Sequence, residues 1–495
     1  MTELNITGAA SACKSPVEWG ELPWAQMKKQ VFRLQMRIAK AEREGRRGKV
    51  KALSLILTTS FAAKCLAVKR VTSSTGAKTS GVDHVTWRTE RQKEKAIPTL
   101  KRNGYKPSPL KRIYIPKKNG KRRPLSIPTM KDRGMQALHL LALEPIVEEW
   151  ADPNAYGFRR KRSTQDAIEQ CHIALGKKTS AQFVLEGDIR DCFGQISHDW
   201  LLENIPMDVK ILKKFLKAGF MENNKLTRIT EKGTPQGSII SPALTVMTLS
   251  GLEKALRPTK RRKTEREKIN VIAYADDFIV TGATTQILEN IVKPKLEDFL
   301  KVRGLELSKE KTKITHISEG YNFLGFNMKK YRNGKVLTKP AKSNIQSFKK
   351  ELKCLIRQGD ALPTVKLVHA LNQKITGWTN YYKSVVSSKI FSKIDSYVVH
   401  ALLKWGLKRH ARHGKRWIVR QYFTKYKGDN WRFFAKEKYG KIVYLKRPTD
   451  TKIRRHIKIR GLANPFHPEY KKYFETREMM RKNNCLTYTK VNLLG

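Results

Sequence analysis

Two adjacent carboxylates, Asp276 and Asp277, stand between two apolar runs in residues 270–281, whose sequence is NVIAYADDFIVT. The runs predict two strands joined by an acidic turn. Neighbouring carboxylates between apolar strands repel each other unless water or a cation screens them. Such a turn can hold Mg²⁺, which prefers one or two protein carboxylates together with substrate phosphates. An ordinary Asp-Asp hairpin turn is the simpler alternative, and the motif alone does not decide between the two.

A second acidic position favours the metal site. Asp188 ends the apolar strand that we expect from Phe183 onwards, and Phe193 follows five residues later. Nucleotidyl transfer uses two metal ions between the attacking 3′-hydroxyl, the α-phosphate and the leaving pyrophosphate, so carboxylates from at least two parts of the chain must converge. We therefore predict that Asp188 joins Asp276 and Asp277. Asp191 is better explained as a surface or turn residue.

Two further segments fit phosphate chemistry. Residues 233–237, GTPQG, are either a plain loop before a helix or a glycine-flanked loop that brings Gln236 against a nucleotide. Residues 113–128, IYIPKKNGKRRPLSIP, predict a β-hairpin around a Lys-Asn-Gly turn. Most cations at the tip of such a hairpin are simply solvated, but some can contact triphosphate oxygens. The candidates are Lys117, Lys118, Lys121, Arg122 and Arg123.

The charge of the chain points to a nucleic-acid partner. With 101 Lys and Arg against 43 Asp and Glu, the formal net charge is +58 and is spread along the whole sequence. A polyphosphate backbone is the natural counter-ion, and the distribution suggests a large RNA. The simpler alternative is a ribosomal-type protein, or a protein whose positive charge only keeps it soluble. No run of 18 apolar residues predicts a membrane span, and the six scattered cysteines suit a reducing cytoplasm without a zinc site.

Strand and helix patterns mix through the middle of the chain, which favours an α+β core. A basic amphipathic helix is expected from Trp24 to about Arg43, and a second helical stretch from about Lys49 to Val71. After Gly334 the strand signal fades, and helical patterns continue to about Arg412. The last segment alternates aromatic and basic residues.

The order of these motifs resembles the successive blocks of a reverse transcriptase: a basic hairpin, D-x-x-x-x-F, TPQG, YADD and Phe323–Phe326. Residues 78–83, KTSGVD, resemble an additional N-terminal block of group II intron enzymes and related non-retroviral ones. Residues 377–382, GWTNYY, resemble the thumb, or maturase X domain, of the same proteins. The chain is thus similar to group II intron-encoded reverse transcriptases with maturase function, over roughly residues 24–470.

This resemblance implies an α+β multidomain protein built like a right hand. We expect an N-terminal extension with basic helices (1–104), fingers and palm (105–334), an α-helical thumb or maturase X domain (335–412) and a small basic DNA-binding domain (413–495). Many relatives continue into an H-N-H endonuclease with cysteine pairs. Cys485 is the only cysteine after Cys354, so no endonuclease is expected, and His456 and His467 suit core or surface roles.

The resemblance also implies roles for individual residues. The catalytic, metal-binding triad would be Asp188, Asp276 and Asp277 around two Mg²⁺ ions. Phe193 would exclude a ribose 2′-hydroxyl, and the dNTP would meet Lys117, Arg123 and Gln236. The primer grip would consist of Phe323, Leu324, Gly325 and Phe326, and residues 306–312 resemble the lysine-bearing block that follows the active-site hairpin. Ser238 departs from the second glycine of many relatives, which is tolerable if its side chain points away from the template.

The expected function is RNA-directed DNA synthesis with DNA as primer, combined with maturase binding of the intron RNA to promote splicing and mobility. Expected partners are intron RNA and target DNA in a bacterial cytoplasm, with no membrane; the sequence leaves the oligomeric state open. A reverse transcriptase of a retron or a diversity-generating element is the alternative, although such chains are usually shorter and lack the GWxxYY thumb and the tail. Candidate RNA-binding cations are Lys28, Lys29, Arg33, Arg37, Lys349 and Lys350.

Overall fold

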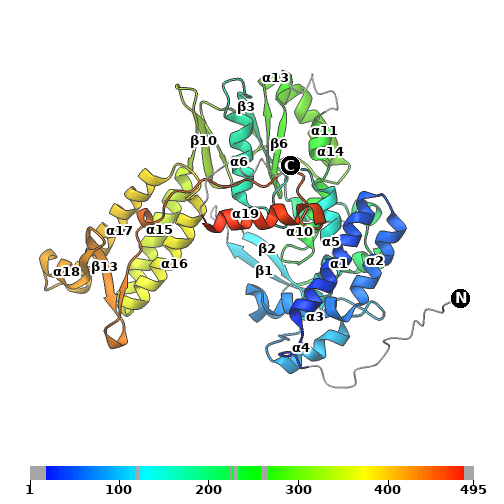
Figure 1. Cartoon of the computed structure of the whole chain (residues 1–495), viewed down its shortest axis with the longest axis horizontal. Helices are drawn as coiled ribbons and strands as arrows, with labels where there is room; N and C mark the ends of the chain where they lie inside the picture. The colour runs from blue at the N-terminus through cyan, green and yellow to red at the C-terminus, as the bar shows by residue number, and fades with distance from the viewer. Residues whose placement is uncertain are drawn as a thin grey trace.

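A computed structural model describes residues 18–116, 120, 122–222, 225–227, 232–257 and 266–483. Its centre is a four-stranded antiparallel sheet in the order β6 (Asn270–Tyr274), β7 (Asp277–Gly282), β3 (Phe183–Asp188) and β8 (Lys313–His316) (Figure 1). The strands expected around the carboxylates are therefore confirmed.

Both faces of this sheet are buried, because successive side chains of a strand point to opposite sides. Val184, Ile272 and Ile279 face the core beneath α6 (Thr164–Leu175). Leu185 and Val280 face a larger core formed with helices that include α10 (Ser241–Leu249) and α14 (Lys293–Lys301). Two-sided burial explains why these strands read as continuous apolar runs.

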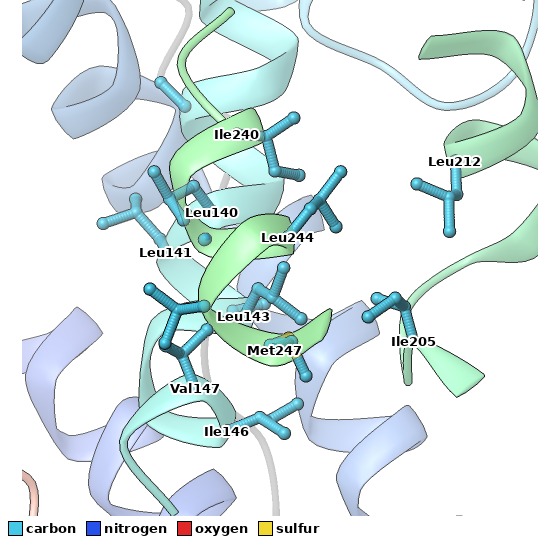
Figure 2. Close-up of a cluster of buried hydrophobic side chains, with 14 of the residues drawn as sticks. Leu140, Leu141, Leu143, Ile146, Val147, Ile205, Leu212, Ile240, Leu244 and Met247 are labelled. Carbon is cyan, nitrogen blue, oxygen red and sulfur yellow. The ribbon is translucent and has the colours of Figure 1, made fainter. Parts of the chain in front are cut away.

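The larger core continues into the N-terminal helices, which surround the nearly buried α5 (Met130–Trp150). Figure 2 shows where apolar side chains of α5 and α10 meet in this core. Helix α1 (Trp24–Arg43) has the expected bounds, but the single stretch expected over 49–71 was wrong. It divides into α2 (Arg47–Thr59) and α3 (Phe61–Thr72), because Ser60 is extended and its hydroxyl accepts from the Ala63 amide as the N-cap of α3.

Among the described residues no single helix is long and apolar enough to cross a membrane. Helices α2 and α3 reach the required length and composition only jointly, across a bend of 68°.

The predicted basic hairpin is present as β1 (Leu110–Pro116) and β2 (Arg122–Ile127), which pair antiparallel. Strands β4 (Phe220–Glu222) and β5 (Lys225–Thr227) complete a sheet in the order β2-β1-β4-β5. The candidate tip residues Lys117, Lys118 and Lys121 lie outside the described residues.

The expectation that strands end near Gly334 was wrong. Strands β9 (Tyr321–Phe323), β10 (Phe326–Lys330) and β11 (Val336–Pro340) form a second antiparallel sheet. Gly334 sits in the turn between β10 and β11 with a φ of 77°, which returns the chain to pair again. A third sheet consists of β12 (Phe423–Tyr426), β13 (Asp429–Lys436) and β14 (Ile442–Tyr444). The aromatic–basic alternation of this segment is thus partly the period-two pattern of a strand.

The helical region after β11 has the expected character. It contains α15 (Lys342–Gln358), α16 (Thr364–Tyr382), α17 (Ser388–Arg409) and α18 (Lys415–Tyr422). The shorter helices elsewhere are α4 (Glu90–Ala96), α7 (Cys192–Gln195), α8 (His198–Asn204), α9 (Val209–Leu216), α11 (Leu252–Leu256) and α13 (Thr285–Ile287).

Side-chain packing crosses the expected domain boundary between residues 412 and 413. Phe423 and Phe433 share a core with α15, α16 and α17. Ile459 and Tyr473 instead join the core beneath α6, and the C-terminal helix α19 (Lys471–Asn483), red in Figure 1, lies at the centre of the molecule, away from β13. The described part of residues 413–495 is therefore divided between two cores and does not fold around one of its own.

Candidate active site

The register of the central sheet brings the three predicted carboxylates together. Asp188 at the end of β3 lies directly opposite Asp277 at the start of β7. Directly opposite residues of antiparallel strands have Cβ atoms about 5 Å apart on the same face. Tyr274 pairs with Asp277 to close the β6–β7 turn, so Ala275 and Asp276 occupy its tip. Residues almost 90 positions apart thus meet at one end of the sheet.

A segment that sequence reasoning missed supports this turn. The amide of Tyr156 donates to the carbonyl of Ala273 at 2.9 Å, and the amide of Ala273 donates to the carbonyl of Asn154 at 3.0 Å. A Cβ on Gly157 would lie 2.2 Å from the backbone nitrogen of Ala275, so only glycine fits at this position. Ala275 itself has a φ of 59°, an uncommon value for a residue with a side chain. The sequence signal for this close approach is the glycine between Tyr156 and Phe158.

Among the described residues, Lys311 forms an ion pair with one of these carboxylates. The Lys311 ammonium donates to both carboxylate oxygens of Asp188, at 2.9 and 3.1 Å. Lys311 lies in the segment 306–312 that resembles the lysine-bearing block, and two backbone hydrogen bonds fasten that segment to β3 and the residues after it: Ser308 to Asp188, and Arg190 to Glu306.

The other two carboxyls are electrostatically unfavourable as anions. Burial and the charges of Asp276 and Asp188 raise the pKa of Asp277 to about 6. Burial and Asp188 also raise the pKa of Asp276, against the opposing charges of Arg123 and Lys311. Asp277 as a whole residue is solvent-exposed, so water screens part of this repulsion. The carboxylates therefore leave an excess of negative charge at the site, which a divalent cation would offset.

The donor set fits a metal that arrives with its substrate. Within the described ranges, no three His, Cys, Asp or Glu side chains form a ready-made metal cage. Mg²⁺ commonly binds through one or two carboxylates and completes its shell with water and substrate phosphates. The carboxylate pair Asp188–Asp277, with Asp276 beside it, has this open character. The three-ligand set stays a prediction.

Three of the predicted nucleotide-binding residues, Arg123, Phe193 and Gln236, lie on segments that contact one another, whereas Lys117 lies outside the described residues. Phe193, in α7, is half-buried, and its ring lies edge-on to Phe158 at 6.5 Å. Its carbonyl accepts from the amide of Thr234 at 2.6 Å, while the carbonyl of Gln236 accepts from the amide of Ser126 on β2 at 2.7 Å. The 233–237 loop therefore connects α7 to the β1–β2 hairpin, which carries Arg123.

Ser238 is buried, and its hydroxyl donates to the Gln136 side chain at 2.9 Å. The Ser238 side chain points into the protein, which is the kind of orientation that would make a serine tolerable in place of the glycine of many relatives. The two histidines near the C-terminus also make internal contacts: His456 with Asp166 at 2.8 Å, and His467 with Glu149.

The predicted primer-grip residues form the tight turn between β9 and β10, where Leu324 and Gly325 both have positive φ. Tyr381 donates its hydroxyl hydrogen to the Leu324 carbonyl at 2.9 Å, and Tyr382 does so to the Gly325 carbonyl at 3.0 Å. The ring of Phe326 stacks on that of Tyr381 at 5.1 Å. The GWxxYY motif thus fixes this turn, a contact that neither motif reveals in the sequence.

The candidate RNA-binding cations lie on two helices. Four of them, Lys28, Lys29, Arg33 and Arg37, are exposed on α1, whose apolar side faces the core. On α15, Lys350 is exposed, and the Lys349 ammonium lies 5.1 Å from the centre of the Tyr397 ring.

Comparison with known families matches this layout in three consecutive segments. Residues 19–100 match the N-terminal domain of reverse transcriptase, residues 115–328 match reverse transcriptase (RNA-dependent DNA polymerase), and residues 345–423 match the group II intron maturase-specific domain. Protein YkfC of Escherichia coli is 33% identical over 304 residues, which cover 53% of this chain and 78% of YkfC. The chain belongs to the group II intron-encoded reverse transcriptase family. It is an RNA-directed DNA polymerase.

A second relative is similar at lower identity but over more of this chain. The group II intron-encoded protein LtrA of Lactococcus lactis is 29% identical over 410 residues, covering 64% of this chain and 68% of LtrA. Among solved structures, telomerase from Candida albicans is similar at 11% identity with a TM-score of 0.36, over 63% of this chain and 64% of that one, less than two-thirds of its length. That distant likeness carries no argument about function.

Proposed function

We propose that this reverse transcriptase copies its intron RNA into DNA from a DNA 3′-hydroxyl, with dNTPs as substrates, and that it also binds the intron as a maturase that promotes splicing. The observation that carries the polymerase part is the cross-strand pairing of Asp188 with Asp277 beside Asp276. The match over residues 345–423 supports the maturase part and favours it over a retron or diversity-generating lineage.

In this proposal the central sheet and β1–β2 are the palm and fingers, and α15–α17 are the thumb. Asp188, Asp276 and Asp277 would hold two Mg²⁺ ions, which supply activation of the 3′-hydroxyl and charge neutralisation at the phosphates. Arg123, whose charge acts on Asp276, contacts the triphosphate. Phe193 closes the sugar side of the pocket against a 2′-hydroxyl, and Gln236 lines the base side.

Lys311 has a place in the same scheme. Its ammonium neutralises Asp188 in the protein alone. With a divalent cation held by Asp188, the Lys311 ammonium would lie close to the reacting phosphates and could give a proton to the leaving pyrophosphate. The turn 323–326, fixed by Tyr381 and Tyr382, would position the primer end.

The maturase role rests on positive charge at a distance from the carboxylates. The exposed cations of α1 and α15 would contact phosphates of the intron, and residues 413–495 would contact target DNA in a bacterial cytoplasm. Neutralising many phosphates makes binding steeply dependent on salt.

One experiment separates the two activities. Intron splicing at low Mg²⁺ is measured with the wild-type protein, with the double variant Asp276→Ala/Asp277→Ala, and with Asp298→Asn, which removes an exposed carboxylate on α14. We expect the double variant to lose primer extension but to promote splicing, and Asp298→Asn to retain both. Primer extension that survives in the double variant would refute the assignment of these carboxylates to the catalytic metal site. Loss of splicing in the folded double variant would refute a separable maturase role.

A further inference from the structure

A basic pocket of about 280 Å³ lies between the end of α16, the segment 454–457 and α19. Four cationic side chains line it: Lys383, Arg454, Arg455 and Arg481. None of the described lining residues is Asp or Glu, and no ion pair links these four cations to a carboxylate in the described part of the chain. The backbone amide of Arg454 donates to the carbonyl of Lys383 at 2.8 Å, which holds two of the walls together.

A buried carboxylate fixes the wall that carries the arginines. Asp166 is fully buried at the start of α6 and accepts hydrogen bonds from His456 Nε2 at 2.8 Å, the Ile459 amide at 2.8 Å and Arg477 at 2.7 Å. His456 itself lines the pocket, and its side chain is only 8% exposed. The pocket wall is thus fixed before any ligand binds.

Four like charges around one hollow repel one another, water screens part of this repulsion because the arginines are exposed, and a bound anion would remove more of it. Buried Asp166 cannot be that anion, because its oxygens already serve the scaffold. Arginines match the geometry of phosphate oxygens and can bind them in pairs of hydrogen bonds. A phosphodiester backbone also suits a hollow that is open at the surface and bordered by neutral donors such as Asn380 and Ser384.

We propose that this pocket binds backbone phosphates of the intron RNA. RNA is favoured because Asn380, Lys383 and Ser384 belong to the part of the chain that matches the maturase-specific domain. The inference rests on the proposed maturase function and adds to it a contact surface shared by the thumb helices and the C-terminal segment.

The test compares two variants that each remove two positive charges. Arg454→Gln/Arg455→Gln changes exposed residues of the pocket, whereas Lys254→Gln/Lys301→Gln changes exposed lysines on α11 and α14. A plot of the logarithm of the intron-binding constant against the logarithm of the salt concentration has a negative slope. Loss of two phosphate contacts makes that slope shallower by about 1.5. We expect the pocket variant to show this change and about tenfold weaker intron binding, and the control variant to show neither. Both variants should keep the wild-type Tm and the wild-type KM for a short primer–template.

Three results would overturn the inference. Intron binding by the pocket variant equal to that of the control variant would show that only net charge matters. A rise in the KM of the pocket variant for the primer–template, as large as its loss of intron binding, would assign the pocket to the polymerase cleft. A wild-type protein that does not bind the intron at all would refute the proposed maturase function together with the pocket, whereas the first two results leave that function standing.

Discussion

Replacement of Gly157 by alanine is the most sensitive test of the active-site geometry. The new Cβ would lie 2.2 Å from the backbone nitrogen of Ala275, whereas ordinary contacts begin at 3.4 Å, so the turn or its support must move by about 1.2 Å. A displacement of about 1 Å at a catalytic group can lower the rate by roughly 100-fold, or about 2.7 kcal/mol of transition-state stabilisation. Overpacking costs about 1–3 kcal/mol of folding stability, which a domain of ordinary stability survives.

The assay is single-nucleotide incorporation on an RNA template under saturating primer and dNTP. We expect kcat of Gly157→Ala to fall by roughly 100-fold, with intron RNA binding unchanged. The matched control is Gly48→Ala at the start of α2, where a new Cβ meets nothing within 4 Å. That variant should keep full activity and gain a few tenths of a kcal/mol in stability. A folded Gly157→Ala enzyme with near wild-type kcat would show that the position of the turn does not limit the reaction.

Three further predictions concern other parts of the chain. Tyr381→Phe and Tyr382→Phe should each raise KM for the primer–template about fivefold, since each loses a hydrogen bond to the 323–326 turn worth about 1 kcal/mol. Tyr382→Phe also loses the bond that its hydroxyl accepts from Asn344. Tyr397→Phe, whose hydroxyl donates to a carbonyl within the thumb helices, should not raise this KM. Burial raises the pKa of Asp395 to about 6. The folded state therefore keeps a proton that the unfolded state loses above about pH 4, and the unfolding free energy should fall as pH rises from about 4 to 6, by at most about 3 kcal/mol before solvent screening. Denaturant titrations across that range should show a shallower fall in Asp395→Asn than in the wild-type protein, because Asp277, whose pKa is also raised to about 6, still contributes in the variant. Asp166→Ala should lose about 3–5 kcal/mol of unfolding free energy, because it leaves buried cationic partners without their carboxylate; an unchanged denaturation midpoint would contradict that role.

The strands that carry the acidic residues could be predicted because strands buried on both faces have continuous apolar sequences. Their register could not, since the pairing of Asp188 with Asp277 depends on which strands become neighbours. For the support from Gly157 the sequence offers only a glycine between two aromatic residues, and it does not show which backbone approaches that glycine.

The two wrong secondary-structure predictions, one helix over 49–71 and no strand after Gly334, have local causes. Ser60 is a moderate interruption within an otherwise helical sequence, and it divides the helix because its hydroxyl caps the second half. The strand β11 begins two residues after Gly334, and its five residues are too few to stand out against the long helix that follows. The contacts of Asp166 with His456 and Arg477 join residues roughly 300 positions apart, and only the folded chain shows them.

The proposed polymerase mechanism requires that Asp188 and Asp277 act at one reaction centre. A double-mutant cycle tests this requirement most directly. Primer extension on an RNA template would be measured for Asp188→Asn, Asp277→Asn and the double variant, with intron binding as the control for folding. If both carboxylates serve the same reacting atoms, the double variant should be no more than a few times slower than the worse single variant. Rate losses that multiply, as for independent sites, would contradict the shared centre.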